Sequence, residues 1–528
     1  MAAEPWADPD PAEPPSRYEI GAVGVAADAE YRSMYTFINP ISLSSEERRN
    51  FNVLEHRARF GTVIDYDEAV SIDMSIDVLD GVLWGDNGTF GGDPSSDAGV
   101  QVSTKDPNIV KPCIRYDGVG DPLQASSYGY GLCEADVVKV RRLFGQVTTP
   151  IGVLRVGRQP VSMGMTVQVA KGDGRKNRFG VAYEGDYVDR ILFATKPLEA
   201  FKPEGARNTS DKEGLITALL YDRWASDTAH VWRDDVHQVG GALRFLEPDF
   251  GFGEELETQL NYVYRWNKQY GTKVSSVSGR AIARFGDFHI GGGMEANIGS
   301  TREVSAAYAV VTNDPIVDQD IMQFGARGVV RFDQPMWTAY MEVDYASGDG
   351  DPQNRTPLSA VTFSYDTNVG LLLFEHIVRY QSARASAAGV EIIRQLGAET
   401  FPAERVHTRG GFTNALALFP QFDLRPHETL LFRLGALFAW APEPVVDPVA
   451  SLQANDGATI EDDLVNFVGG PPGDFYGIEL DGRFQWRFVE HFALDLEGAV
   501  LFPGDALQDV NGDAVNSYLT QARATMFF

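Results

Sequence analysis

The stretch Tyr476-Gly-Ile-Glu-Leu-Asp-Gly-Arg-Phe-Gln-Trp-Arg-Phe488 alternates between apolar and charged or polar residues almost throughout. Successive side chains of a β-strand point to opposite faces, so this strand has one apolar face and one charged face. The segments 492–502 and 517–528 repeat the pattern. A charged face this dense is typical of a strand with lipid on one side and water on the other, which predicts a transmembrane β-barrel.

The composition agrees with this prediction. The mean hydropathy is −0.20, and no run of about eighteen apolar residues occurs, which excludes membrane-spanning helices. The 53 glycines, 20 tyrosines and 31 phenylalanines suit turns and the aromatic girdles of a barrel. The formal net charge of −29 argues against a nucleic-acid partner, because such a partner requires a basic surface.

From Arg17 onward the sequence divides into about eighteen predicted strands that end in turn residues. They are 17–34, 51–67, 69–84, 137–149, 152–163, 186–196, 214–226, 236–247, 254–267, 273–286, 288–299, 321–333, 336–347, 408–424, 429–441, 476–488, 492–503 and 515–528. The predicted fold is all-β, a single antiparallel barrel over 17–528. Residues 1–16 form a flexible acidic, Pro-rich arm.

The links between the predicted strands sort by length. With both ends in the periplasm, even-numbered strands should be followed by short turns and odd-numbered strands by longer outer loops. The segment 196–213 is the one exception. The predicted long loops are 35–50, 85–136, 164–185, 300–320, 348–407 and 442–475.

Strict alternation identifies the basic side chains of the lumen. An arginine that faces hydrocarbon at the membrane midplane costs about 2–4 kcal/mol, so arginines in these strands should face water or protein. Arg158 falls off the polar parity beside Gly157, which indicates either a β-bulge or a wrong assignment. The predicted pore-lining residues are Arg57, Arg59, Lys139, Arg141, Arg155, Arg158, Arg244, Arg265, Arg280, Arg284, Arg327, Arg331, Arg433, Arg483, Arg487 and Arg523.

These basic residues admit two interpretations. They can pair with lumen acids and make a wide barrel rigid, or their excess can create an electropositive constriction that selects anions. Glu257, Glu295, Glu342 and Asp344 on other strands reduce that excess. Guanidinium groups bind carboxylates in a bidentate way, so a row of them could pass a uronate polymer from site to site.

The loop 348–407 contains Gly370-Leu-Leu-Leu-Phe-Glu-His-Ile-Val-Arg-Tyr-Gln381, with helical spacing of Leu372, His376 and Arg379. The simpler interpretation is an outer helix packed on the rim, and the alternative is a constriction folded into the lumen. A loop of this length is usually functional or mobile, so it is the first place to look for a gate.

Cys113 and Cys133 are the only two cysteines, and both lie in the loop 85–136. They are predicted to form a disulfide, worth about 3 kcal/mol by loop entropy, which favours an exported protein. The first residues have neither a basic start nor an apolar core. We expect that a secretory signal has been removed and that the protein lies in the bacterial outer membrane.

The sequence gives little support for an enzymatic activity or a bound metal ion. The histidines show no paired ligand spacing, and His237, His289 and His491 have no evident catalytic partner, so we predict no enzyme and no zinc or haem site. Asp349 and Asp351, with Asp344, are the weak candidates for a structural calcium ion in an outer loop.

Three stretches resemble the alginate-export porin family of outer-membrane proteins. They are Gly152-Val-Leu-Arg-Val-Gly-Arg-Gln-Pro160, Ala346-Ser-Gly-Asp-Gly-Asp-Pro352 and the segment 486–506. The resemblance implies a monomeric, eighteen-stranded barrel with an arginine-lined lumen that exports an anionic exopolysaccharide. It assigns a pore role most directly to Arg155 and Arg158.

The predicted function is therefore a passive outer-membrane channel that exports an anionic, alginate-like polysaccharide, supplied by a periplasmic delivery complex. A diffusion porin for small anions or nutrients is the alternative within transport. A plugged barrel that acts as a cell-surface scaffold is the alternative from another class.

Overall fold

The computed structural model describes residues 17–43, 50–67, 69–85, 102–106, 109–112, 136–161, 177–181, 186–210, 212–226, 236–251, 253–268, 271–350, 357–364, 367–382, 411–448, 450–451 and 464–528. The arm 1–16, Cys113, Cys133 and Asp351 lie outside these residues, so the disulfide remains a prediction. None of the helices within the described ranges has the length and apolar character needed to cross a membrane.

One large antiparallel sheet forms the molecule. Its strands are β1 (Arg17–Ile20), β2 (Val23–Asn39), β3 (Phe51–Tyr66), β4 (Val70–Gly85), β7 (Asp136–Thr149), β8 (Gly152–Pro160), β9 (Tyr187–Thr195), β10 (Gly214–Ser226), β11 (Val236–Glu247), β12 (Glu255–Asn267), β13 (Lys273–Phe285), β14 (Phe288–Thr301), β15 (Gln319–Asp333), β16 (Trp337–Ala346), β17 (Ala415–His427), β18 (Leu430–Trp440), β19 (Phe475–Val489), β20 (Phe492–Pro503) and β21 (Ser517–Phe527). β5 (Val102–Asp106) and β6 (Ile109–Pro112) form a separate pair.

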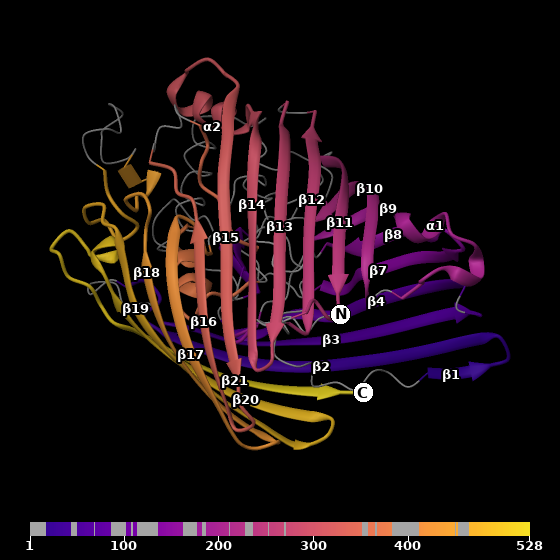
Figure 1. Ribbon diagram of the computed structural model, residues 1–528. Helices are drawn as coiled ribbons and strands as arrows, with labels where there is room; N and C mark the ends of the chain where they lie inside the picture. Colours follow the sequence, from indigo (N-terminus) through magenta and orange to yellow (C-terminus); the bar gives the residue numbers. More distant parts are fainter. Residues whose placement is uncertain are drawn as a thin grey trace.

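The sheet closes on itself (Figure 1). From β2 onward each strand of this sheet pairs with the next one, and β2 pairs with β21 from Glu30↔Phe527 to Asn39↔Tyr518. The sheet has nineteen strands, of which β1 is a short addition to the first part of β2, so eighteen strands form the barrel wall. The predicted closed antiparallel barrel is confirmed.

Two predicted strands differ from the structure. The predicted strand 17–34 is a hairpin, β1 and β2, because Gly21 adopts a positive φ of 65° that permits a tight turn between them. The predicted strand 408–424 is β17, which begins at Ala415 and continues to His427. Apart from these two, each predicted strand corresponds to one strand of the wall.

The predicted alternation of short and long links is present. Short turns follow β3, β7, β11, β13, β15, β17 and β19, and the long loops leave from the opposite ends of the strands. In Figure 1 the helix α2 (Glu303–Thr312) marks the long-loop end, above β14 and β15.

The exceptional link 196–213 is an ordered loop with two short helices, α1 (Pro197–Ala200) and η1 (Glu204–Ala206). Arg207 Nη1 donates to the carbonyl oxygen of Pro150, which ties the loop to the neighbouring turn. A hydrogen bond from the Asn208 backbone N–H, together with Lys202, lowers the pKa of Glu199.

The two faces of the wall have the predicted character. On β19, Leu480 and Trp486 are 47% and 42% exposed on the outside, whereas Glu479 and Asp481 are almost fully buried on the inside. The largest apolar core also lies inside, at the long-loop end, and includes Ile38, Phe51 and Leu501 from the wall. The barrel therefore has an apolar outside and a lumen that is partly filled by protein.

The outward face supplies a first prediction. The substitution Leu480→Arg should destabilise the folded barrel in a bilayer, because it places a charge in hydrocarbon. The free energy of unfolding should decrease by about 2–4 kcal/mol. Urea titration of the protein in phospholipid vesicles measures this change. Leu198→Arg is the control, since Leu198 is 68% exposed in the loop 196–213 and should tolerate the charge. Equal effects of both variants would contradict the lipid-facing assignment.

Candidate functional site

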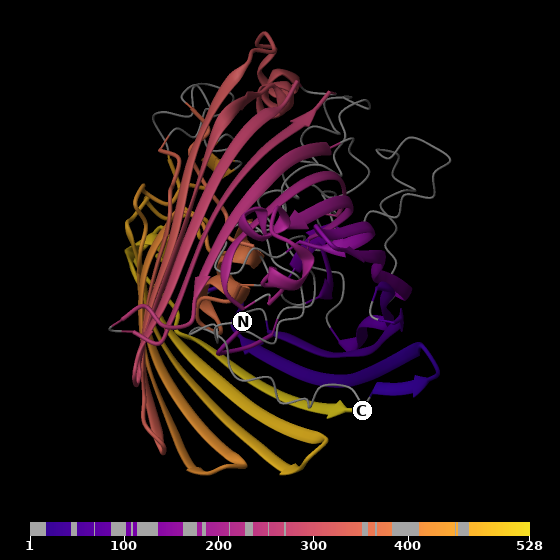
Figure 2. The same cartoon turned by 45° about the vertical axis from the view of Figure 1, so that its right-hand side comes forward.

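Residues 367–382 lie inside the barrel and not on its rim. They include the π-helix η2 (Leu373–Val378) and continue in helical conformation to Ser382. Leu371, Phe374 and Ile377 are at most 1% exposed and belong to the same apolar cluster as the wall residues Ile38 and Leu501. Figure 2 shows this orange helical segment within the curve of the wall. Of the two predicted positions for this helix, the favoured rim position is wrong.

Glu479 of β19 anchors this segment. Its carboxylate accepts hydrogen bonds from the backbone N–H groups of Leu371, Leu372 and Leu373 at 2.6, 2.8 and 2.5 Å. The first N–H groups of a helix have no partner within the helix and carry partial positive charge, so a carboxylate satisfies both requirements. Glu479 is fully buried, so water does not compete for these hydrogen bonds.

A second segment, 177–181, also lies inside the barrel. It belongs to the loop between β8 and β9, yet it contacts strands from the C-terminal part of the chain. The backbone N–H of Gly180 donates to Glu497 of β20 at 2.9 Å. The N–H of Asn368 donates to Asn177 Oδ1 at 3.1 Å and joins the two segments. Two loops from distant parts of the sequence therefore meet in the lumen.

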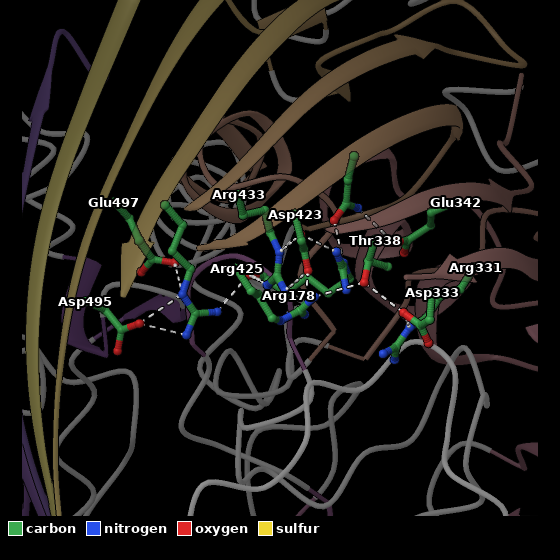
Figure 3. A network of polar contacts seen from close by, with 12 residues as sticks. Arg178, Arg331, Asp333, Thr338, Glu342, Asp423, Arg425, Arg433, Asp495 and Glu497 are labelled. Atoms are coloured by element: carbon green, nitrogen blue, oxygen red, sulfur yellow. Dashed lines mark hydrogen bonds and ion pairs between the residues drawn. The ribbon is translucent and has the colours of Figure 1, made fainter. Parts of the chain in front are cut away.

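Asp423 of β17 is the centre of the cluster in Figure 3. It is fully buried and binds Arg178 at 2.8 Å, Arg425 at 3.0 Å and Arg433 at 2.7 and 2.8 Å. The guanidinium carbon of Arg178 also lies 4.0 Å from the centre of the Tyr340 ring. Three guanidinium groups thus bind one carboxylate, and we call these four residues the "Asp423 cluster".

At five arginines of the remaining wall, the acid that binds the arginine is more deeply buried than the arginine itself. We call Arg59, Arg190, Arg244, Arg280 and Arg327 the arginine ladder. Arg244 is bound by Glu257, and the side chains are 23% and 2% exposed. The corresponding values are 11% and 0% for Arg190 and Asp222.

The same order holds at the other members of the ladder. The side chains of Arg327 and Glu342 are 13% and 3% exposed, and those of Arg59 and Asp77 are 9% and 1% exposed. Arg280 shares Glu257 with Arg244. Buried carboxylates outnumber buried arginines among the described residues, but each arginine of the ladder is more exposed than the acid that binds it.

The other predicted pore-lining residues also have partners within the wall. Arg155 donates to Gln146 at 3.0 and 2.7 Å, and Arg265 lies 4.1 Å from the ring centre of Trp224. Arg487 faces inward and is half-buried. The remaining pairs are Arg57 with Glu30, Arg141 with Asp77, Lys139 with the Tyr187 ring, Arg284 with Glu254, Arg331 with Asp333, and Arg483 and Arg523 with Asp495 and Glu497.

Arg158 is placed on the outer face, which corrects its inclusion in the pore lining. It lies opposite Leu143 on one side and Asp189 on the other, and neither strand pair of β8 contains a register shift. Leu143 is 47% exposed on the lipid side. The bulge lies instead at Arg141 of β7, the extra residue between Val140 opposite Ile76 and Arg142 opposite Ser75. Both Arg141 and Arg142 point toward lumen acids.

Sequence reasoning missed several residues of the site. Arg190 lies on the inward parity of a predicted strand, so alternation could have identified it. Arg178 lies in a loop without periodicity, and its partner Asp423 is 245 residues away, so no local pattern points to it. The anchoring role of Glu479 depends on a loop that the sequence does not place in the lumen.

The described residues contain no group of three or more His, Cys, Asp or Glu side chains that could hold a metal ion. Asp344 is buried beside Arg327, and Asp349 accepts a hydrogen bond from the N–H of Ser359 at 3.1 Å. The calcium site therefore remains a prediction. His237 does have a partner, because Tyr221 Oη lies 2.9 Å from its Nδ1 atom.

Comparison with known proteins identifies the fold but not a family. No protein-family model and no curated protein matches the chain. The solved structures it resembles include Acinetobacter baumannii OccAB1, with 8% identity, 96% of each chain covered and a TM-score of 0.50. Another is Pseudomonas aeruginosa OccK2 (OpdF) in complex with glucuronate, with 8% identity, coverage of 96% of this chain and 98% of that chain, and a TM-score of 0.46.

The outer membrane protein opdK from Pseudomonas aeruginosa is also similar, with 10% identity, coverage of 95% and 98%, and a TM-score of 0.45. At these identities the similarity concerns the fold. The chain is a closed, eighteen-stranded β-barrel of the bacterial outer-membrane type. The resemblance to the alginate-export porin family remains a prediction.

Proposed function

We propose that the protein is a selective outer-membrane channel for small anionic solutes, with carboxylates as the preferred class. The observation that carries the proposal is the arginine ladder, in which each of the five arginines is more exposed than the acid that binds it. A solute in the lumen then meets guanidinium groups first. These groups bind carboxylates in a bidentate way and attract anions from solution.

The two inner segments favour small solutes over a polymer. Residues 177–181 and 367–382 are held by buried hydrogen bonds to Glu497 and Glu479, so they occupy part of the lumen. A polysaccharide of alginate type would require these contacts to break. Export of such a polymer therefore has less support than passage of small anions, and it remains the prediction that follows from the family resemblance.

The proposed mechanism is passive and involves no covalent chemistry. Each arginine of the ladder is already partly neutralised by an acid, so its attraction for a passing anion is weak. Weak binding at several sites in succession lets a solute enter and also leave, as conduction requires. The arginines thus guide the anion, and the inner segments limit its size.

Arg155 and Arg158 provide the test, because they are three residues apart on opposite faces of β8. Arg155→Gln should lower the preference for chloride over potassium, measured as the reversal potential in a KCl gradient across a planar bilayer. Arg155 donates hydrogen bonds to Gln146, which is neutral, so the substitution does not leave Gln146 as a charge without its counter-ion. Arg158→Gln should leave the reversal potential unchanged.

Three results would count against the proposal. Unchanged anion preference in Arg155→Gln would remove that residue from the path. Loss of preference in Arg158→Gln would contradict the outward assignment. The absence of any steady current in the unmodified protein would favour the scaffold over the channel. Block of the current by glucuronate, but not by glucose, would support carboxylates as the solute class.

A further inference from the structure

A row of polar and aromatic residues crosses the outer face at the long-loop ends of β8 to β13. Each member lies directly opposite the next one on the neighbouring strand. The row is Arg158, Asp189, Arg223, His237, Trp266 and Lys273. Directly opposite residues of paired strands share a face, so these side chains all point away from the lumen.

The row lies close to the long-loop ends of its strands, where a barrel leaves the hydrocarbon. Arg158 is two residues from the end of β8, and Lys273 is the first residue of β13. An outward arginine costs about 2–4 kcal/mol at midplane but only about 0–1 kcal/mol near the interface. Below the row the outer face becomes apolar, with Leu219 69% and Leu260 53% exposed.

Aromatic rings support this position. The ring of His237 stacks with those of Tyr221 and Trp266, with centroid distances of 6.1 and 5.6 Å. Tyr264 stacks with Trp266 at 5.8 Å. Tyr and Trp gather where a barrel leaves the hydrocarbon, because their rings are apolar and their tips are polar.

Within the row itself, cations outnumber carboxylates. It contains the cations Arg158, Arg223 and Lys273 and a single carboxylate, Asp189, which binds Arg158 at 3.0 and 3.1 Å. Beyond Lys273 the next opposite residues are Ser300 and Asp320, so the basic part ends there. The chain has a net charge of −29, so a group of cations on its membrane-facing surface is unusual for this protein and points to an anionic ligand.

We propose that this row binds the phosphate groups of an anionic glycolipid in the outer leaflet. The two ends of the row are five strand spacings apart, about 24 Å, which is wide enough for a headgroup with more than one phosphate. Arginine binds phosphate in a bidentate way and lysine as a point charge. The surface thereby recruits negatively charged lipid that the rest of the protein would repel.

The test measures binding of lipid A by native mass spectrometry of the full-length protein in detergent. The double variant Arg158→Gln/Lys273→Gln should bind bisphosphorylated lipid A about tenfold more weakly, as expected for the loss of charge-assisted hydrogen bonds. Lys202→Gln/Lys212→Gln removes the same charge at the opposite rim and should bind like the unmodified protein. Dephosphorylated lipid A should bind weakly to all three proteins.

Equal binding by the two double variants would overturn the proposal, and so would equal binding of the phosphorylated and dephosphorylated lipids. Heat-modifiable migration in electrophoresis verifies that each variant is folded. Conductance in bilayers that contain no lipid A should be the same for the unmodified protein and both variants. Failure of the lipid test is therefore distinguishable from failure of the proposed transport function.

Discussion

Replacement of residues 367–382 by a Gly-Ser linker of equal length is expected to raise the single-channel conductance several-fold. The segment is buried inside the barrel, where Leu371, Phe374 and Ile377 pack against the wall. Conductance depends on the cross-section open to water, so removal of this helical segment should widen the narrowest part of the path. Planar-bilayer recording measures the change.

The control is the same replacement of α2, residues 303–312, which lies at the long-loop end in Figure 1 and should not change the conductance. The point variant Glu479→Gln provides an independent measurement. It removes the charge that holds three backbone N–H groups, so the segment should detach intermittently and the current should fluctuate between two levels. Unchanged conductance in the linker variant would show that the segment does not restrict the path.

Loss of the Asp423 carboxylate is expected to destabilise the barrel by about 3–5 kcal/mol, because it leaves buried guanidinium groups without their counter-ion. The variant is Asp423→Ala. Arg433 is fully buried and binds Asp423 through two nitrogen atoms, so the change affects a site that water does not reach. The midpoint and slope of urea unfolding in vesicles give the free energy.

The matched control is Asp318→Ala, which breaks an exposed ion pair with Arg302 in which the side chains are 66% and 53% exposed. Exposed pairs contribute about 0–1 kcal/mol, so this variant should unfold close to the unmodified protein. A similar small effect at Asp423 would mean that water reaches the cluster and that Arg178 and Arg433 are solvated. Asp423→Glu should recover part of the stability, since it retains the charge.

Much of the wall was predictable because its pattern is local. Alternation over 476–488 identified an apolar outer face, and the same rule placed Arg244, Arg280 and Arg327 in the lumen. Alternation also placed Arg158 on the outward, apolar parity of its strand. The structure agrees, because Arg158 lies on the outer face and β8 contains no bulge. The bulge at Arg141 in β7 was missed, because nothing in a single strand reveals its register with the neighbouring strand.

The contents of the lumen were not predictable in the same way. The sequence suggested a helix within 370–381, but its position inside the barrel depends on Glu479, about a hundred residues later in the chain. The balance of charge was also misjudged from counts alone. Basic residues exceeded acids in the predicted set, whereas buried carboxylates outnumber buried arginines among the residues that the structure describes.

The sequence by itself determined that this protein is a closed antiparallel barrel with lipid outside and charged residues inside, because side-chain direction in a strand depends only on the parity of each residue. The tertiary structure alone decided which loops enter the lumen, which acid holds each arginine and where Arg178 lies. The contacts of the inner loops join residues hundreds of positions apart, such as Arg178 and Asp423 at a separation of 245. No periodic pattern along the chain records them, since they arise only when the sheet closes.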